Sequence, residues 1–440
     1  MSSQIAPAAG LMMAATASGS GKTLLTMGIL AALRKRGLPL QPGKTGPDYI
    51  DPAFHTAVAG TPSLTFDSFA MSAPSLHALA HLSAGRHFVV EGVMGLFDGA
   101  ASRRGSSYDV ARILGLNLVL IVNVHGVSDT AAFIADGIRQ HCQDVNFAGV
   151  ILNQLGSPRH ANQIERALTD FGIPCLGRFY KDSELTIPSR HLGLIQADEC
   201  VRSDDWHAFL TRLTDAVEAG LDIDSLAALS ARPTIDSNNI PQAASLIPPP
   251  GQQIAIARDT AFGFSYEHIM QGWRNAGAEI MPFSPLANEA APQEADFIYL
   301  PGGYPELHLP ALSGASIFQD SLRRAAERGC LIYGECGGYM VLGSAICGAD
   351  GTYWPMAGLL DLVTSFAVPK RTLGYRFLAA TEGPFTGQWT GHEYHVTQAI
   401  EQQGTPLFSV TNSLGENLGN TGLYKESVYG SYMHLIAKTD

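Results

Sequence analysis

Short apolar runs alternate with stretches of helical spacing through the first half of the chain. A strand buried on both faces reads as a continuous apolar run, and its alternation with amphipathic helices is typical of a doubly wound α/β fold. The first half is therefore predicted to be a parallel sheet with helices on both faces. The predicted strands are residues 10–15, 87–91, 117–124 and 146–153, and the predicted helices include 24–36 and 130–140.

The pattern changes near the middle of the chain. Residues 231–251 turn to Pro, Ser and Asn without periodicity, as a stiff linker would. A second α/β series follows, with predicted strands at 253–258, 295–300 and 330–334. We therefore divide the chain into a domain at 1–230, a linker at 231–251 and a domain at 252–440.

Composition restricts the classes of partner. The 440 residues carry a net charge of −12, which provides no basic field for nucleic acid or for an anionic membrane. No apolar stretch reaches the ~20 residues of a membrane span, and the first apolar run lacks the basic flank of a signal peptide. The six cysteines form no C-x-x-C pair, which argues against a zinc site or a disulfide framework. We expect a soluble, cytoplasmic protein without nucleic-acid or membrane partners.

A glycine-rich loop ending in Lys-Thr follows the first predicted strand and opens the first predicted helix. In this context backbone N–H groups and the helix N-terminus converge on an anion. Lys22 is expected to reach the terminal phosphates of ATP, and the Thr23 hydroxyl to ligate Mg²⁺. A Gly-Ser turn that merely precedes Lys-Thr is the alternative, which the strand and helix context disfavours. The predicted ATP-binding residues are Ser18, Gly19, Ser20, Gly21, Lys22, Thr23 and Asn153.

Acidic and amide side chains follow other predicted strands of this half. Asp48 and Glu91 are expected to complete Mg²⁺ coordination as oxygen ligands, and Lys44 to steady a substrate carboxylate against the γ-phosphate. A solvated loop carboxylate is the alternative for either acid alone. Asn153 ends an apolar strand, where its amide is suited either to the adenine edge or to capping the next helix.

A cysteine lies between a strand and a predicted helix in the second half. The glycines that flank Cys336 permit the strained turn of a nucleophile elbow, although a lone cysteine is more often a buried structural residue. His434, in a short apolar strand-like run near the C-terminus, is our choice of base. A core histidine is the alternative there, and His392 and His395 are the rival bases.

The same half offers an oxyanion site. A glycine pair, Gly302 and Gly303, ends a predicted strand, and its N–H groups together with that of Gly337 are suited to holding a developing negative charge.

These segments resemble known families. The phosphate loop, with Thr16 after Ala15, is similar to that of the dethiobiotin synthetase group of ATPases. Residues 301–303 and 334–338 with His434 resemble a class I glutamine amidotransferase. Most of that class has Glu two residues after the histidine; Ile436 stands there, as in the cobalamin-pathway branch, which works with a Cys-His pair.

The two domains in this order resemble the cobyrinate or hydrogenobyrinate a,c-diamide synthases over nearly the whole chain, nearest to the aerobic, cobalt-free-substrate members. The segments that carry this resemblance are 46–55, 91–99, 190–194, 301–306 and 362–366.

The resemblance implies a P-loop NTPase-like parallel sheet followed by a flavodoxin-like amidotransferase sheet. It implies ATP- and glutamine-dependent amidation of the a and c acetate carboxylates of hydrogenobyrinate or cobyrinate, through an acyl phosphate, in cobalamin biosynthesis. Mg²⁺ is the implied cofactor, and ATP, L-glutamine and the ring acid are the implied ligands, with a homodimer as a further candidate assembly. The implied contacts with the ring acid are Lys44, Asp48, Tyr49 and Asp98.

Other functions share parts of this pattern. Cobyric acid synthase and nickel-sirohydrochlorin a,c-diamide synthase have the same architecture. A partitioning or maturation ATPase would leave the Cys336 elbow without a role. A glutaminase subunit with a regulatory nucleotide domain would leave the Lys44 loop without one.

Overall fold

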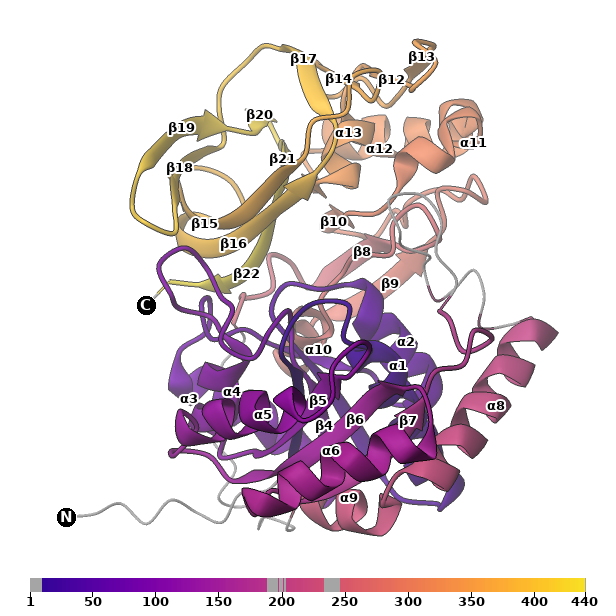
Figure 1. The fold of residues 1–440 in the computed structure, drawn as a ribbon. Coiled ribbons are helices and arrows are strands. Elements are labelled where there is room, and N and C mark those ends of the chain that lie inside the picture. The colour runs from indigo at the N-terminus through magenta and orange to yellow at the C-terminus, as the bar shows by residue number, and fades with distance from the viewer. Residues whose placement is uncertain (1–9, 188–196, 198–200, 202, 233–245, 440) are drawn as a thin grey trace. The chain divides into compact units, whose positions relative to one another are not determined.

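The computed structural model describes residues 10–187, 197, 201, 203–232 and 246–439. The chain forms two compact units, the first holding elements β1 to α9 and the second β8 to β22 (Figure 1). In the predicted linker, Ile247 is buried, and its carbonyl accepts a hydrogen bond from Trp273 Nε1. The predicted domain limits stay a prediction, because residues 233–245 lie outside the described part, as does segment 190–194.

A seven-stranded parallel sheet organises the first unit, with strand order β3-β2-β4-β1-β5-β6-β7. Its strands are β1 Leu11–Ala15, β2 Leu40–Thr45, β3 Leu64–Phe66, β4 His87–Glu91, β5 Asn117–Asn123, β6 Phe147–Leu155 and β7 Cys175–Tyr180. Its helices are α1 Lys22–Lys35, α2 Ile50–Ala59, α3 Ala73–Ala80, α4 Ser107–Leu114, α5 Thr130–Gln140, α6 Pro158–Asp170, α8 Asp204–Gly220 and α9 Ile223–Ser230.

Both faces of this sheet are covered by helices, as the apolar runs predict. Successive side chains of a strand point to opposite faces. Val119 and Ile121 of β5 therefore pack in the core that includes α1, α8 and α9, whereas Leu120 and Val122 pack in the core with α5 and α6. The doubly wound α/β class is confirmed.

The predicted strands of this unit are all present, but β3, β7 and β2 were not predicted. Of these three, β2 carries Lys44. Its sequence, Leu-Gln-Pro-Gly-Lys-Thr, resembles a loop because Pro cannot donate to a ladder and Gly weakens a strand. Every residue of β2 is nevertheless buried. A Cβ on Gly43 would come within 3.0 Å of Phe66 and 3.1 Å of Val90, so neighbouring strands fill the space that a side chain would need.

The second unit is built on a six-stranded sheet with order β20-β21-β11-β10-β8-β9, in which only β20 runs antiparallel. Along the five parallel strands the chain order is 2-1-3-4-5, which is the flavodoxin-like order expected. The strands are β8 Gln253–Ala257, β9 Glu279–Phe283, β10 Phe297–Leu300, β11 Leu331–Glu335, β20 Leu423–Lys425 and β21 Val428–Ser431. The helices are α10 Glu267–Asn275, α11 Leu309–Gly314, α12 Ser316–Glu327 and α13 Gly337–Leu342.

Two further sheets in this unit were not predicted. A four-stranded sheet has the order β13-β12-β14-β17, and a five-stranded antiparallel sheet has the order β19-β18-β15-β16-β22. His434 lies on β22, beside the strand β16 that carries His392 and His395. The strands are β12 Ala345–Cys347, β13 Tyr353–Pro355, β14 Leu362–Ser365, β15 Thr372–Ala380, β16 Gly387–His395, β17 Gln398–Gln402, β18 Phe408–Asn412, β19 Asn417–Thr421 and β22 Met433–Lys438.

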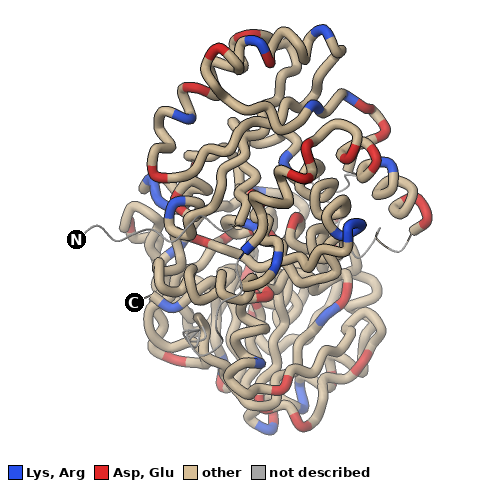
Figure 2. The backbone as a smooth tube through the Cα atoms, turned by 90° about the horizontal axis from the view of Figure 1, so that it is seen from below, with Lys and Arg blue, Asp and Glu red and all other residues tan. Residues whose placement is uncertain are grey.

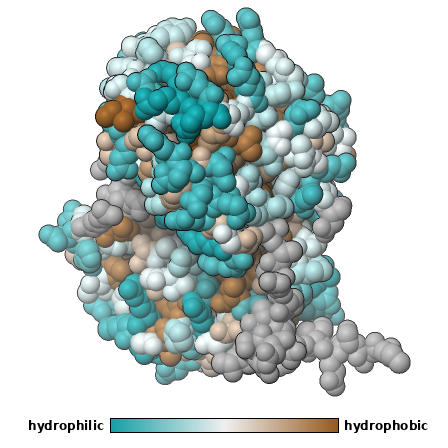
Figure 3. Space-filling model, turned by 180° about the vertical axis from the view of Figure 1, so that it is seen from behind, coloured by the Kyte–Doolittle hydropathy of each residue, from teal (hydrophilic) through white to brown (hydrophobic). Residues whose placement is uncertain are grey.

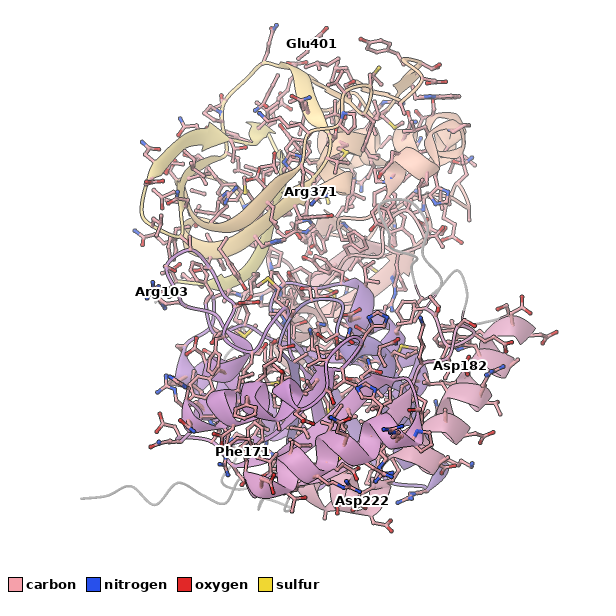
Figure 4. All side chains as sticks on the ribbon, in the orientation of Figure 1. Arg103, Phe171, Asp182, Asp222, Arg371 and Glu401 are labelled. Carbon is pink, nitrogen blue, oxygen red and sulfur yellow. The ribbon has the colours of Figure 1, made fainter. Side chains whose placement is uncertain are left out.

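Basic and acidic residues are interspersed along the chain (Figure 2). The face drawn in Figure 3 mixes hydrophilic and hydrophobic side chains. None of the helices in the described residues has the length and apolar character needed to cross a membrane. Charged side chains at the periphery have local roles: Asp182 accepts hydrogen bonds from Arg212, and Asp222 caps α9 (Figure 4).

Candidate active sites

The phosphate loop joins β1 to α1. Two glycines with positive φ and two side-chain hydrogen bonds to its carbonyl groups fix its conformation. Gly19 and Gly21 have φ angles of +75° and +88°, which favour glycine. Ser20 Oγ donates to the Ala17 carbonyl at 2.9 Å, and Asn153 Nδ2 donates to the Ser20 carbonyl at 2.7 Å. A Cβ on Gly21 would lie 2.2 Å from Asn153 Nδ2, so only glycine fits there.

Asn153 supports this loop instead of capping the helix that follows it. Its side chain is 1% exposed, and its Oδ1 accepts the N–H of Gln154 at 2.8 Å. The hydroxyl of Ser157 caps α6, so the capping alternative for Asn153 is wrong. The predicted contact of Asn153 with adenine stays a prediction.

Lys22 is buried and bound to two backbone carbonyls. Its Nζ donates to the Met94 carbonyl at 2.6 Å and to the Ala17 carbonyl at 3.2 Å. Met94, in the loop after β4, has a φ of +50°, a strained conformation for a residue with a side chain. Burial lowers the pKa of Lys22, and the positive charge of Lys44 lowers it further.

The hydroxyl of Thr23, at the start of α1, touches two carboxylates from other elements. It donates to Glu91 Oε1 at 2.9 Å and to Asp51 Oδ2 at 3.2 Å. Lys44 Nζ bonds both of these oxygens too, at 2.8 Å for Glu91. Burial opposes the charge of Lys44, but the three nearby acids outweigh it and raise the pKa of Lys44 well above its ordinary value.

Glu91 is fully buried at the end of β4 and shares its second oxygen with a histidine. Glu91 Oε2 lies 2.8 Å from Nε2 of His55, a residue of α2 that is also fully buried. Burial alone would raise the pKa of Glu91, but Lys44 and His55 outweigh it and hold that pKa well below its ordinary value.

Asp51, to which the sequence analysis assigned no role, contacts Thr23, and the predicted coordination of Mg²⁺ by Asp48 stays a prediction. Asp48 Oδ1 accepts the N–H groups of Ile50 and Asp51 at 2.9 and 3.2 Å, at the start of α2, and its Oδ2 lies 3.4 Å from Lys44 Nζ. Of the two acids, Asp51 is therefore the one that contacts Thr23. Both acids lie in segment 46–55 with two residues between them, so the segment alone does not show which of them contacts Thr23.

The other predicted substrate contacts lie in the same region. Lys44 is 2% exposed and is engaged by acids of the protein. Tyr49 is partly exposed just before α2. Asp98 Oδ2 accepts the N–H of Gly95 at 2.8 Å, and its charge acts on Lys22. Their contacts with a ring acid stay predictions.

The donor set around Thr23 fits Mg²⁺, which prefers oxygen ligands. One hydroxyl and two carboxylates from Thr23, Asp51 and Glu91 share hydrogen bonds. Within residues that the structure describes, no three His, Cys, Asp or Glu side chains are placed to hold a metal ion. An ion here would therefore need the hydroxyl, the phosphates of the nucleotide and water to complete its coordination.

In the second unit, Cys336 forms the turn between β11 and α13. Its φ of +50° and ψ of −103° are strained for a residue with a side chain. A Cβ on Gly338 would lie 2.0 Å from the Leu300 carbonyl oxygen, so the elbow requires glycine there. Cys336 is 4% exposed, and its N–H donates to the Ser431 carbonyl at 2.8 Å.

His434 is the histidine that pairs with this thiol. It is 2% exposed and forms a side-chain hydrogen bond with Cys336. Burial opposes its charge, but Cys336 and then Glu335 outweigh burial and raise the pKa of His434 to about 10.

The rival histidines are engaged differently. Both ring nitrogens of His395 have acceptors, Glu393 Oε1 at 3.0 Å and the Thr397 carbonyl at 2.8 Å. Burial, then the charge of His434, lowers the pKa of His392 to about 3, so it stays neutral.

The three glycines predicted for the oxyanion site gather around Cys336. A Cβ on Gly302 would lie 3.3 Å from Cys336 Cβ and 2.5 Å from His434 Cε1, and one on Gly337 would lie 3.2 Å from the nitrogen of Gly303. Across the described residues, neither Gly303 nor Gly337 donates its N–H to a turn, loop or cap carbonyl. Both groups are therefore available to a ligand, as an oxyanion site requires.

Sequence reasoning missed Asp51, His55 and Glu335 as site residues. All three lie inside segments that it singled out, but their roles depend on contacts with residues distant in the chain.

Both halves of the chain match known protein families. Residues 11–195 match the CobQ/CobB/MinD/ParA nucleotide binding domain, and residues 253–440 match the CobB/CobQ-like glutamine amidotransferase domain. A glutamine amidotransferase domain and a nucleotide-binding domain are therefore present in one chain.

Curated relatives match nearly the whole chain. The hydrogenobyrinate a,c-diamide synthase of Rhizobium meliloti (strain 1021) is 46% identical over 97% of this chain and 99% of its own length. That of Brucella abortus biovar 1 (strain 9-941) is 47% identical over 97% of this chain and 98% of its own. Among solved structures, PurLQS from Thermotoga maritima covers 42% of this chain and 87% of its own at 17% identity, with a TM-score of 0.31, too low to bear on the fold. On the strength of the two domain matches and these relatives, the chain belongs to the hydrogenobyrinate a,c-diamide synthase family.

Proposed function

We propose that this enzyme amidates the a and c acetate carboxylates of hydrogenobyrinate in cobalamin biosynthesis, using ATP and glutamine. The observation that carries the proposal is the presence of two complementary sites in one chain. A Cys336–His434 pair in a nucleophile elbow suits the release of ammonia from glutamine, and the phosphate loop with its acids suits activation of a carboxylate. The names of the relatives support the ring substrate.

The glutaminase half follows from the elbow. The thiolate of Cys336 attacks the side-chain carbonyl carbon of glutamine, and the N–H groups of Gly303 and Gly337 stabilise the oxyanion that forms. His434 gives its proton to the amide nitrogen as the C–N bond breaks, and ammonia leaves. Water then gives a proton to His434, attacks the thioester and releases glutamate with the free thiol.

The synthetase half follows from the phosphate loop. A ring carboxylate oxygen attacks the γ-phosphorus of ATP, the bond to ADP breaks, and an acyl phosphate forms. Ammonia attacks the acyl carbon, and phosphate leaves to give the amide. Lys22 would exchange its two carbonyl acceptors for phosphate oxygens. Each amide consumes one ATP and one glutamine, so the diamide consumes two of each.

The first unit would bind both Mg²⁺ and the ring acid. Thr23, Asp51 and Glu91 would hold Mg²⁺, which would neutralise charge on the phosphates. Asp48, Tyr49 and Asp98 would contact the ring acid, with Lys44 beside them.

We place the enzyme in the cytoplasm, where ATP and glutamine are present, and keep the homodimer as a candidate assembly.

Mass spectrometry of the reaction product tests the proposal. Purified enzyme is incubated with ATP, glutamine and either hydrogenobyrinate or cobyrinate. Conversion of two carboxyl groups to carboxamides on hydrogenobyrinate supports it. A strong preference for cobyrinate would overturn the cobalt-free substrate, and amidation of other side chains would favour cobyric acid synthase. Absence of any amide product would overturn the function.

A further inference from the structure

The carboxylate of Glu335 is buried directly beside the base of the glutaminase site. Glu335 is the last residue of β11 and is 2% exposed. Its Oε1 lies 3.1 Å from His434 Nδ1 and accepts a hydrogen bond from the Tyr299 hydroxyl at 3.0 Å. Its Oε2 accepts the backbone N–H of Leu435 at 3.2 Å. A carboxylate this far from water needs such partners, because burying an unpaired charge is costly.

The strand that carries His434 provides no carboxylate of its own. Ile436, two residues after His434, is fully buried and apolar, and it is the residue left without a partner where the pairing of β22 with β16 is irregular. The pairing of β11 with β21 places Glu335 opposite Ser431, three residues before His434. The fold therefore brings an acid to His434 from the strand that ends at the nucleophile.

We propose that Glu335 is the positioning residue of His434, so that Cys336, His434 and Glu335 form a triad in which nucleophile and acid are consecutive residues. The inference deepens the proposed function and rests on the glutaminase site described above.

The contact with Glu335 determines which imidazole nitrogen faces the thiol. A neutral imidazole carries one N–H, and a carboxylate beside Nδ1 keeps that hydrogen on Nδ1. The lone pair of Nε2 is then directed to the thiol of Cys336. When His434 takes the thiol proton, the negative charge of Glu335 stabilises the imidazolium, and its hydrogen bond contributes to the raised pKa of His434.

The Glu335→Gln variant tests this role, because it keeps the shape of the side chain and removes its charge. Tyr299→Phe is the matched control, since it removes one buried hydrogen bond from the same carboxylate and leaves the contact with His434 intact. We expect Glu335→Gln to lower the glutaminase kcat by roughly 10²-fold or more with a small change in KM for glutamine. The loss in Tyr299→Phe should be much smaller.

The alkylation rate of Cys336 by iodoacetamide, followed against pH, provides a readout apart from turnover. Wild type and Tyr299→Phe should share one alkylation profile, because Glu335 still faces His434 in both. In Glu335→Gln the alkylation profile should shift to higher pH. Cys336→Ser measures the background from the other thiols, and the near-UV circular dichroism spectrum and the urea unfolding curve of each preparation report that the protein is folded.

The outcomes separate this inference from the proposed function. If Glu335→Gln had the same kcat and the same alkylation profile as Tyr299→Phe, the positioning role of Glu335 would be overturned. If the unfolding curve shows that Glu335→Gln is not folded, Glu335→Asp takes its place, keeping the charge at shorter reach. An intermediate kcat with a nearly wild-type alkylation profile then supports the role, and a fully wild-type kcat overturns it. Glutamine-dependent amidation by Cys336→Ser would instead overturn the proposed glutaminase site.

Discussion

The carboxylates of Asp51 and Glu91 are held next to the Thr23 hydroxyl by hydrogen bonds, in a position suited to a cation. Asp51 and Glu91 share the hydroxyl of Thr23 and the ammonium of Lys44, so an ion that enters here meets oxygens already gathered. Asp48 uses its oxygens differently, accepting two N–H groups at the start of α2. The two acids are therefore expected to differ in their effect on Mg²⁺.

Asp51→Asn should raise the Mg²⁺ concentration for half-maximal ammonia-dependent amidation by about tenfold or more, because an amide oxygen is a weaker Mg²⁺ ligand than a carboxylate. Asp48→Asn is the matched control, since an amide oxygen still accepts both N–H groups of α2, and its shift should be clearly smaller. Titration of Mg²⁺ at saturating ATP measures both. Equal shifts, or a larger one in Asp48→Asn, would restore Asp48 as the ligand.

Glutaminase activity should persist to high pH. The pKa of His434 is raised to about 10, so the folded enzyme keeps the imidazolium at pH values below that and loses it as pH rises through about 10. A neutral His434 has no proton for the departing amide nitrogen, and activity should fall there. The pH profile of glutamate formation checks this. An alkaline decline centred near 6.5, the pKa of an ordinary histidine, would contradict it.

At the residue scale, sequence reasoning found the groups whose chemistry is explicit in a local motif. Lys22, Thr23 and Cys336 lie in such motifs, and His434 was chosen from its local setting. Their roles remain proposals, but the structure places Thr23 against Glu91 and His434 against Cys336, as those roles require. Asp51, His55 and Glu335 were missed because their identities become informative only when distant strands bring partners to them.

At the scale of elements, the parallel strands that are continuous apolar runs were predictable. The parallel strands β2, β3, β7 and β9 and the two further sheets of the second unit were not predicted. Buried strands such as β1, β5 and β10 are continuous apolar runs with a distinct signal. The strands of the antiparallel sheet mix polar residues and glycines, for example Asn417–Thr421, and several are exposed, so their pattern resembles loops. β2 was missed for the related reason that Pro42 and Gly43 interrupt it.

Two glycines of the phosphate loop test how closely this loop packs against Asn153 of β6. Gly19 and Gly21 both have positive φ, but a Cβ on Gly19 meets nothing within 4 Å, whereas one on Gly21 would lie 2.2 Å from Asn153. Gly19→Ala should cost about 1 kcal/mol in unfolding free energy from the left-handed conformation alone. Gly21→Ala should cost clearly more, because it adds a steric clash. Urea denaturation measures both, and equal losses would show that Asn153 does not constrain the loop.

At the scale of the whole molecule, the two proposed chemistries belong to two compact units of the chain. Lys22→Ala should abolish amidation from either glutamine or ammonia, because the carboxylate is no longer activated, while glutaminase activity survives at least in part. Cys336→Ala should abolish only glutamine-dependent amidation and keep activity with high free ammonia. Assays of both variants with each nitrogen source measure this division. Loss of both activities in Cys336→Ala, or unchanged amidation in Lys22→Ala, would contradict it.

The account depends most on the coupling of these chemistries on one substrate. The most direct measurement follows ADP, glutamate and ring amides together in a single reaction of the purified enzyme with hydrogenobyrinate, ATP and glutamine. The account predicts one ADP and one glutamate for each amide formed, and a final product with two new carboxamides. Consumption of ATP and glutamine without amide formation on the ring, or amide formation that needs neither, would contradict it.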